Sequence, residues 1–371
     1  MSKNILITGG GTGGHISPGL ALFEKLSEDG SMNPFFLTGK NDLRFSTFGE
    51  LDSSKLLTYR APALTRNPFK LPGFVISFIR ALLRVKRIIR KKNISAVVGM
   101  GGYVSAPALA AAKLSGTPYF LCEQNSVPGK VTVWFEKNCA MVFSTFAESA
   151  EYLKFPEKFV HCGNPIRNSV LVSAGKTEAK KAFHLEHCSK IILVIGGSQG
   201  AVKLNELTLG LKNKYPHEFK NTGIIWSTGD LSFDEFKRRS QSEPDAGSIY
   251  ISPYIKRVGK AYRACDIAIS RSGAGVMMEL AAAGVPSILI PYPFAAMDHQ
   301  DKNADAFVKA GAAVKISDSD AVAEKVAPVL FELLSHPRRL KDMAESAKKA
   351  AMTDAADVIV KHIKDTLINR G

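Results

Sequence analysis

Residues 4–15 read NILITGGGTGGH, an apolar run followed at once by a cluster of glycines. The run Asn4–Thr8 predicts a buried strand, and Gly19–Ser27 beyond the glycines has the spacing of an amphipathic helix. Strand, glycine turn and helix in this order open a doubly wound, parallel α/β domain. Glycines at this junction also let backbone N–H groups approach an anion at the start of the helix.

The alternation of strand and helix continues to the end of the chain. The remaining strands are predicted at Pro34–Thr38, Ala96–Gly99, Pro118–Cys122, Ala140–Ser144, Lys190–Ile195, Gly223–Ser227, Ser248–Ile251, Asp266–Ile269, Pro286–Ile290 and Ala312–Ile316. A second glycine cluster, Gly196–Gly200, restarts the pattern about half-way along. We therefore expect two Rossmann-like domains facing each other across a cleft, residues 1–163 and 164–353. A C-terminal helix of about residues 354–370 is expected to pack back on the first domain.

Composition places the chain among ordinary globular proteins, with 371 residues, 45% hydrophobic and 22% charged. Its five cysteines form no CxxC pair, which argues against a disulfide framework or a zinc cage and for a reducing compartment. The N-terminus shows no signal-peptide pattern, and no run of about 18 apolar residues is present. These features predict a cytoplasmic protein.

The net charge of +15 is concentrated in one segment. Between Arg60 and Lys92 there are ten Lys or Arg residues and no Asp or Glu. The same segment places apolar side chains at i, i+4 spacing, namely Phe74, Phe78 and Leu82 beside Val75, Ile79 and Leu83. A core-facing amphipathic helix would explain the apolar side alone. The unbalanced positive charge instead favours contact of the Phe69–Lys92 region with an anionic membrane.

The first glycine loop matches the dinucleotide fingerprint at Gly9, Gly11 and Gly14. The acid that would bind the ribose of NAD is missing, because the second strand ends at Thr38-Gly39. A tight turn alone would need one or two of these glycines. His15 follows them directly, and an imidazole with an ordinary pKa of about 6.5 suits a general base, although a lone histidine is often structural.

Three further loops carry polar or glycine-rich sequence after a predicted strand. Gly99–Tyr103 can supply backbone donors, and Gly196–Gly200 adds Ser198 but lacks the Gly-Lys-Ser/Thr end of an ATP-binding P-loop. Ser270–Gly275 combines a helix N-terminus with Arg271, which suits a diphosphate. Glu279, one turn further on, is either a ribose ligand or a solvated surface glutamate.

Two acidic segments complete the candidates. Asp298–Asn303 offers hydrogen-bonding side chains for a sugar, with helix capping by Asp298 as the competing explanation. Asp318-Ser319-Asp320 spells the DxD of metal-dependent sugar transferases, but it is interpreted as a helix N-cap with acids in the first turn. We predict no metal and no cofactor.

Seven motifs in order from residue 9 to about residue 310 carry a family resemblance. They are GGGTGGH, GMGGYVS, EQN at 123–125, GNPIR at 163–167, GGSQGA, SRSGA and HQDKNA. Together they resemble the MurG family, bacterial transferases of N-acetylglucosamine from its UDP derivative to lipid-linked N-acetylmuramyl-pentapeptide. The resemblance implies a GT-B fold and an inverting hexosyltransferase of peptidoglycan biosynthesis, which serves cell shape and division. The first domain would bind the lipid acceptor and the membrane, and the second would bind the UDP-sugar.

The resemblance also assigns roles by position. It implies that His15 is the base that deprotonates the 4-hydroxyl of the muramyl sugar. It implies acceptor contacts from Thr12, Gly13, Gly14, Gly101, Gly102, Tyr103 and Asn125. It implies contacts to UDP-N-acetylglucosamine from Asn125, Arg167, Ser198, Tyr254, Ile255, Arg271, Glu279, His299 and Gln300. Cys122 departs from the pattern, because the family often has histidine there.

Partners and location follow from the same resemblance. The substrates would be UDP-N-acetylglucosamine and the lipid-linked muramyl-pentapeptide, at the inner face of the cytoplasmic membrane. The alternatives are a GT-B transferase with another lipid acceptor, a UDP-N-acetylglucosamine epimerase and an NAD-dependent oxidoreductase. A nucleic-acid-binding protein is not expected, since nucleic-acid binding would not explain the glycine loops.

Overall fold

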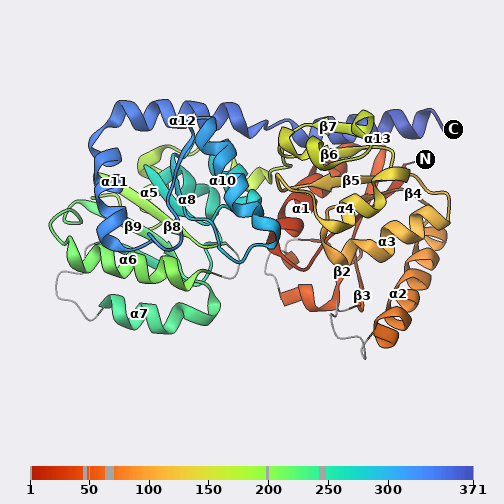
Figure 1. Ribbon diagram of the computed structural model, residues 1–371, viewed down its shortest axis with the longest axis horizontal. Helices are drawn as coiled ribbons and strands as arrows, with labels where there is room; N and C mark the ends of the chain where they lie inside the picture. The colour runs from red at the N-terminus through yellow and green to blue at the C-terminus, as the bar shows by residue number, and fades with distance from the viewer. Residues whose placement is uncertain are drawn as a thin grey trace. The chain divides into compact units, whose positions relative to one another are not determined.

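The computed structural model describes residues 2–44, 48–49, 51–62, 71–197, 200–241 and 248–370. The chain forms two compact units: unit 1 comprises Met1–Arg167 and Thr353–Gly371, and unit 2 comprises Asn168–Met352. Figure 1 shows the blue C-terminal helix α13 (Ala355–Ile368) among the red-to-yellow elements of unit 1. Within that unit, α13 packs against α1 (Gly13–Glu28).

Unit 1 is built on a seven-stranded parallel sheet in the order β3-β2-β1-β4-β5-β6-β7. Its strands are β1 (Lys3–Thr8), β2 (Met32–Gly39), β3 (Leu56–Tyr59), β4 (Ile94–Gly99), β5 (Tyr119–Glu123), β6 (Val142–Ser144) and β7 (Phe159–His161). The sequence pattern did not predict β3 and β7. Both are short strands at the two edges of the sheet, where a strand has one neighbour only and needs no long apolar run.

Helices cover both faces of this sheet. Besides α1 and α13 they are α2 (Leu71–Lys91), α3 (Gly102–Leu114) and α4 (Lys130–Phe135), with 3-10 turns η1 (Lys40–Arg44), η4 (Glu136–Asn138), η5 (Ala147–Tyr152) and η6 (Pro156–Lys158). In β1, Ile5 and Ile7 join the core cluster under α1 and α13, whereas Leu6 joins the cluster under α2 and α3. Burial of both faces explains why this strand is a continuous apolar run.

Unit 2 repeats the design with a six-stranded parallel sheet in the order β10-β9-β8-β11-β12-β13. Its strands are β8 (Lys190–Ile195), β9 (Thr222–Ser227), β10 (Ile249–Ser252), β11 (Ile267–Ser270), β12 (Ser287–Leu289) and β13 (Ala313–Lys315). Its helices are α5 (Lys176–Lys181), α6 (Val202–Lys214), α7 (Phe233–Gln241), α8 (Val258–Ala264), α9 (Ala274–Ala282), α10 (His299–Lys309), α11 (Ala323–Ser335) and α12 (Pro337–Ala351), with 3-10 turns η7 (Asn168–Val170), η8 (Asp230–Ser232) and η9 (Ala296–Asp298).

The core of unit 2 contains buried polar side chains that are hydrogen-bonded. The fully buried Trp226 on β9 donates its indole N–H to the side-chain oxygen of Asn205 at 2.9 Å. Asn205 in turn donates to the carbonyl of Thr228 at 3.0 Å. These bonds satisfy polar atoms that would otherwise lose their water partners on burial, and they tie α6 to the end of β9.

Strand order decides which loops meet. In each sheet the chain first adds strands on one side of the first strand and then adds the remaining strands on the other side of it. As a result, β1 lies beside β4 and β8 lies beside β11. Ligands of doubly wound sheets bind beyond the carboxyl ends of the strands at this reversal. In unit 1 the loops at that place are Gly9–Thr12 and Met100–Gly101, and in unit 2 they include Gly196, Gly197 and Arg271–Gly273.

No helix in the described part of the chain is both long and apolar enough to span a membrane.

Candidate active site

The two glycine loops of unit 1 pack directly on one another. Met100 donates its N–H to the carbonyl of Thr8 at 2.8 Å, which continues the pairing of β4 with β1 past the strand ends. A Cβ atom on Gly101 would lie 3.0 Å from Cδ2 and 3.1 Å from Nε2 of His15. Gly101 also has a φ of +86°, a conformation that glycine adopts without strain. A larger residue at position 101 would therefore strain the backbone and crowd the imidazole of His15.

His15 lies in the first turn of α1 and is held through Nδ1. This atom is 3.0 Å from Thr12 Oγ1 and 3.2 Å from the carbonyl oxygen of Gly10. A carbonyl oxygen can only accept, so the bond to Gly10 requires the proton on Nδ1. In that tautomer the lone pair is on Nε2, the atom that faces Gly101. In this tautomer Nε2 is the basic atom of the ring, and Thr12 Oγ1 can also accept from Nδ1.

Asp42, which was not among the predicted site residues, organises the first loop. Its buried carboxylate accepts from Gly11 N–H at 3.0 Å, from Thr38 Oγ1 at 3.0 Å and from Gly39 N–H at 3.2 Å. The acid missing at Thr38-Gly39 therefore stands three residues later, on η1, and binds the loop. Since Gly11 N–H is occupied in this way, it is not directed at a ligand anion. The only sequence signal was an acid soon after the second strand.

The third loop of unit 1 follows β5 and contains Asn125. The buried carboxylate of Glu123 accepts from the N–H of Asn125 at 3.1 Å, from that of Gly129 at 2.8 Å and from Thr132 Oγ1 at 2.6 Å. The Asn125 side chain also hydrogen-bonds Glu123. Burial raises the pKa of the Glu123 carboxyl, and these hydrogen bonds oppose that shift. Asn125 is thus held by the acid of its own motif.

Tyr103 and Cys122 lie in different surroundings within unit 1. Tyr103, on the first turn of α3, is 38% exposed, and its ring lies 3.3 Å from the Cβ position of Gly11. Cys122 is buried in the core, where burial raises the pKa of its thiol well above the usual value. Gly13 and Gly14 begin α1 behind Thr12. Thr12, Gly101, Gly102 and Tyr103 are therefore brought around His15 and its loop.

In unit 2, Arg271 is a buried residue that joins three loops. One terminal nitrogen donates to the carbonyls of Ile290 and Pro291, each at 3.1 Å, and to Asp318 Oδ1 at 2.6 Å. The guanidinium also lies 5.5 Å from the ring centroid of Tyr292. The interpretation of Asp318–Asp320 as a helix cap is wrong, because α11 begins at Ala323 with Val322 as its N-cap. A diphosphate contact by Arg271 stays a prediction.

Glu279 lies on α9 and is buried with a polar partner. Its Oε2 accepts from the hydroxyl of Tyr262 on α8 at 2.8 Å. The alternative of a solvated surface glutamate is therefore wrong. Tyr254 and Ile255 follow β10; the carbonyl of Tyr254 accepts from Ser252 Oγ at 2.9 Å and Ile255 is buried. Their contacts to a nucleotide stay predictions.

The segment before α10 has an unusual backbone. Met297 and Asp298 both have positive φ, 55° and 53°, and Asp298 makes no side-chain capping bond. Asp298 therefore stands at the N-cap position of α10, as the capping explanation expects, but its side chain does not cap the helix. His299 Nδ1 lies 2.7 Å from the carbonyl of Ala296, and Gln300 Oε1 accepts from Tyr292 N–H at 2.9 Å. Strained backbone of this kind is concentrated at ligand sites, which supports the prediction for His299 and Gln300.

Ser198 and Arg167 are the remaining predicted contacts. Ser198 lies outside the described residues. Arg167 is the last residue of the first segment of unit 1 and is half-buried.

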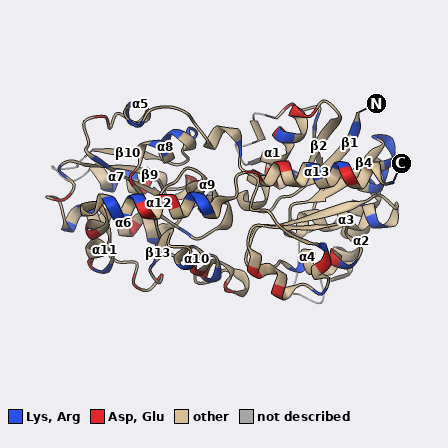
Figure 2. Cartoon of the chain, turned by 90° about the horizontal axis from the view of Figure 1, so that it is seen from above, with Lys and Arg blue, Asp and Glu red and all other residues tan. Residues whose placement is uncertain are grey.

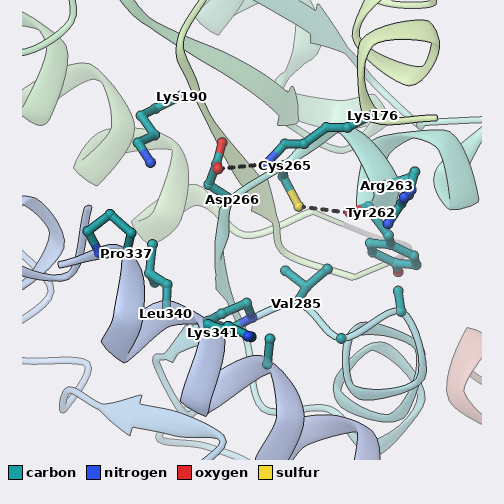
Figure 3. Close-up of a pocket in the computed structure, with 14 residues that line it drawn as sticks. Lys176, Lys190, Tyr262, Arg263, Cys265, Asp266, Val285, Pro337, Leu340 and Lys341 are labelled. Carbon is teal, nitrogen blue, oxygen red and sulfur yellow. Dashed lines mark hydrogen bonds and ion pairs between the residues drawn. The ribbon is translucent and has the colours of Figure 1, made fainter. Parts of the chain in front are cut away.

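A pocket of about 250 Å³ lies at the N-terminal ends of the unit 2 strands, away from the loops described above. Figure 3 shows its lining residues. Lys190 starts β8, and Asp266 and Pro286 precede β11 and β12. Lys176 Nζ pairs with Asp266 at 2.6 Å, and Asp266 also accepts from Ile191 N–H at 2.8 Å. None of the predicted site residues lines this pocket.

Comparisons with known proteins agree with this architecture. The glycosyltransferase family 28 N-terminal domain matches residues 5–144, and the family 28 C-terminal domain matches residues 191–359. A UDP-N-acetylglucosamine--N-acetylmuramyl-(pentapeptide) pyrophosphoryl-undecaprenol N-acetylglucosamine transferase of Chlorobium limicola is 34% identical over 365 residues, 97% of this chain and 98% of that protein.

Solved structures give the same result for the fold. The crystal structure of Acinetobacter baumannii MurG matches with a TM-score of 0.72 and 26% identity, over 98% of this chain and 99% of that one. A UDP-N-acetylglucosamine 2-epimerase structure matches with a TM-score of 0.65 at 12% identity, over 97% and 95%, and shows the fold alone. The predicted fold class, two Rossmann-like domains of the GT-B type, is confirmed. The chain belongs to the MurG family of N-acetylglucosaminyltransferases, within glycosyltransferase family 28.

Proposed function

We propose that this protein transfers N-acetylglucosamine from UDP-N-acetylglucosamine to the 4-hydroxyl of lipid-linked N-acetylmuramyl-pentapeptide. This reaction converts lipid I to lipid II in peptidoglycan synthesis. The relative from Chlorobium limicola is named for this activity, and the match covers 98% of its length. The observation that carries the proposal is His15, whose Nδ1 is bound to Gly10 and whose Nε2 lies against the second glycine loop.

In the proposed reaction, His15 Nε2 takes the proton from the 4-hydroxyl of the acceptor sugar. The oxygen attacks the anomeric carbon of N-acetylglucosamine while the bond from that carbon to the diphosphate breaks. Attack from the face opposite to the leaving group inverts the anomeric centre. UDP leaves as an anion, which Arg271, Ser198 and the N-terminus of α9 would stabilise.

Transfer of radiolabelled sugar from UDP-N-acetylglucosamine to a short-chain lipid-linked muramyl-pentapeptide tests this function. A labelled disaccharide lipid is the expected product. An epimerase would instead convert UDP-N-acetylglucosamine in reactions without lipid, and another transferase of the same fold would need a different acceptor. Folded protein that forms no labelled lipid II would rule out the proposed function.

Glu279 offers a test of the donor site. Replacement by glutamine is expected to weaken binding of UDP-N-acetylglucosamine about tenfold, because a neutral amide accepts hydrogen bonds from the ribose hydroxyls less strongly than a carboxylate. Calorimetry with UDP and with its 2′-deoxy analogue measures the effect. Wild-type protein should prefer UDP, and the variant should lose most of that preference.

Tyr262→Phe is the matched control, because it removes the hydroxyl bonded to Glu279 and leaves the carboxylate. We expect it to keep the preference for UDP over the deoxy analogue. An unchanged preference in Glu279→Gln would show that the carboxylate does not bind the ribose.

We infer that α2 attaches the protein to an anionic membrane surface. Ala81, Val85 and Ile89 turn one face of α2 into the core, with Phe78 and Leu82 packed beside them. A second apolar stripe remains exposed at 46–58% of each side chain: Leu71, Val75, Ile76, Ile79 and Leu83. The core-facing explanation therefore accounts for one face only. Phe69 and Lys70 of the predicted region lie outside the described residues.

The charge of α2 fits the same role. The helix carries Arg80, Arg84, Lys86, Arg87, Arg90 and Lys91 and has no Asp or Glu (Figure 2). An exposed apolar stripe flanked by basic side chains is the pattern of helices that lie in the interface of anionic lipids.

Replacing Ile79 and Leu83 together by serine should weaken binding to vesicles with anionic lipid about 10- to 100-fold, since two aliphatic side chains lose their burial in lipid. Vesicle sedimentation measures this binding. Leu231→Ser is the control, because Leu231 is fully exposed in unit 2. Equal binding by the double variant and the wild-type protein would disprove the role of α2.

A further inference from the structure

We propose that Asp42 acts on His15 through the peptide group that joins Gly10 to Gly11. The two side chains hydrogen-bond opposite ends of this one peptide group. The proposal rests on the proposed function, in which His15 is the base, and it adds a residue that stabilises the protonated imidazole without touching it.

The geometry consists of two hydrogen bonds in series. Gly11 N–H donates to Asp42 Oδ1 at 3.0 Å, and the carbonyl of Gly10, in the same peptide group, lies 3.2 Å from His15 Nδ1. The other oxygen of Asp42 accepts from Thr38 Oγ1 and Gly39 N–H. These bonds fix the carboxylate, and the carboxylate fixes the plane of the peptide.

Close packing leaves this peptide little freedom to turn. A Cβ atom on Gly10 would lie 2.3 Å from Asp42 Oδ2 and 2.7 Å from Thr38 Oγ1. A Cβ atom on Gly102 would lie 2.8 Å from the Gly10 carbonyl oxygen and 3.1 Å from His15 Nδ1. Glycines at positions 10 and 102 therefore admit the carboxylate on one side of the peptide and the imidazole on the other.

The chemistry follows from the polarisation of an amide. A carboxylate that accepts from the N–H draws its hydrogen and leaves more negative charge on the carbonyl oxygen, because hydrogen bonds in series strengthen one another. That oxygen then binds His15 Nδ1–H more strongly when Nε2 has taken a proton and the ring is positive. Asp42 therefore raises the basicity of His15. It is a positioning residue, since the peptide stands between it and the base.

Two phenols are among the titratable side chains that the structure describes near this loop. Tyr103 on α3 lies over Gly11, and Tyr59 on β3 is buried near both Asp42 and Tyr103. Burial, followed by the neighbouring Asp42 and Tyr103, raises the pKa of Tyr59. Among these described neighbours, Asp42 is the one whose side chain hydrogen-bonds the peptide group that His15 contacts.

The first test uses the wild-type protein and nuclear magnetic resonance. Labelled histidine should show His15 with its proton on Nδ1 at high pH. The Gly11 amide proton should shift as pH changes, with the same midpoint as the His15 ring. The reason is that the ring hydrogen-bonds the carbonyl of Gly10, which belongs to the same peptide group as the Gly11 amide. A Gly11 amide that does not follow His15, or a ring that carries its proton on Nε2, would overturn the proposal. Neither result depends on transfer activity, so failure of the proposed function would be seen separately.

The second test compares Asp42→Asn with Thr38→Val. Loss of the negative charge should move the midpoint of the His15 titration about one pH unit lower. The rise of kcat/KM with pH should move by the same amount, and kcat on the plateau should fall by up to about tenfold because the base is weaker. Thr38→Val removes a bond to Asp42 but keeps the charge, so it should leave both midpoints in place.

A merely structural role for Asp42 gives a different result. In that case Asp42→Asn would lower thermal stability and activity while the His15 midpoint stayed within about 0.2 units of wild type, small against the shift expected from a nearby charge. That outcome overturns the proposal. If Asp42→Asn does not fold, the Gly11 amide titration in the wild-type protein decides the question.

Discussion

Replacement of His15 by alanine is expected to lower kcat for sugar transfer about 10²- to 10⁴-fold, the usual contribution of a general base. The 4-hydroxyl of a sugar is a weak nucleophile until its proton is removed as the new bond forms. We propose the Nε2 atom of His15 as the base, because Nδ1 contacts the carbonyl of Gly10 and Nε2 lies against the Cβ position of Gly101. Steady-state transfer to a short-chain lipid acceptor, at saturating donor, measures the loss.

The pH profile makes this test specific. A histidine base must be neutral to accept a proton, so wild-type kcat/KM should rise with pH through the pKa of His15, and this rise should disappear in the variant. His161→Ala is the control, since His161 is another unit 1 histidine, bonded to the carbonyl of Thr145 at 3.2 Å. Near-full turnover by folded His15→Ala protein would remove His15 as the base.

Gly101→Ala is expected to lower transfer about 10²-fold, the scale of loss that a displacement of about 1 Å can cause in an active site. The new methyl group would lie 3.0 Å from Cδ2 and 3.1 Å from Nε2 of His15. It would both displace the ring and block the atom that takes the proton. The φ of +86° with a ψ of −175° lies in a region restricted essentially to glycine, and it adds a backbone cost of about 1–3 kcal/mol for any residue with a Cβ.

The control must carry the backbone cost without the contact. Gly116 has a φ of +68° in the same unit, and nothing lies within 4 Å of its Cβ position. Gly116→Ala should therefore lose stability in thermal unfolding and keep wild-type kcat. If both variants lost the same activity, the effect of Gly101→Ala would be one of stability, and the proposed contact with His15 would be discarded.

Local pattern was enough to predict most of the architecture. Buried parallel strands are continuous apolar runs, as in β1 and β8, and the glycine clusters that follow them are easily recognised in the sequence. The short edge strands β3 and β7 lack that pattern and were missed. In α2 the spacing predicted an amphipathic helix, but the sequence could not tell which apolar stripe faces the core. Contact with the sheet decides that.

The sequence alone determined the fold class, the family motifs and the candidate base, because each depends on residues close together in the chain. Tertiary structure alone decided which partners those residues have. Asp42 binds Gly11 from 31 residues away, and Arg271 pairs with Asp318 across 47. Such bonds form only after strand order has set β1 between β2 and β4, and β12 between β11 and β13. Hydrogen bonding depends on distance in space, and the packing of the sheet determines that distance.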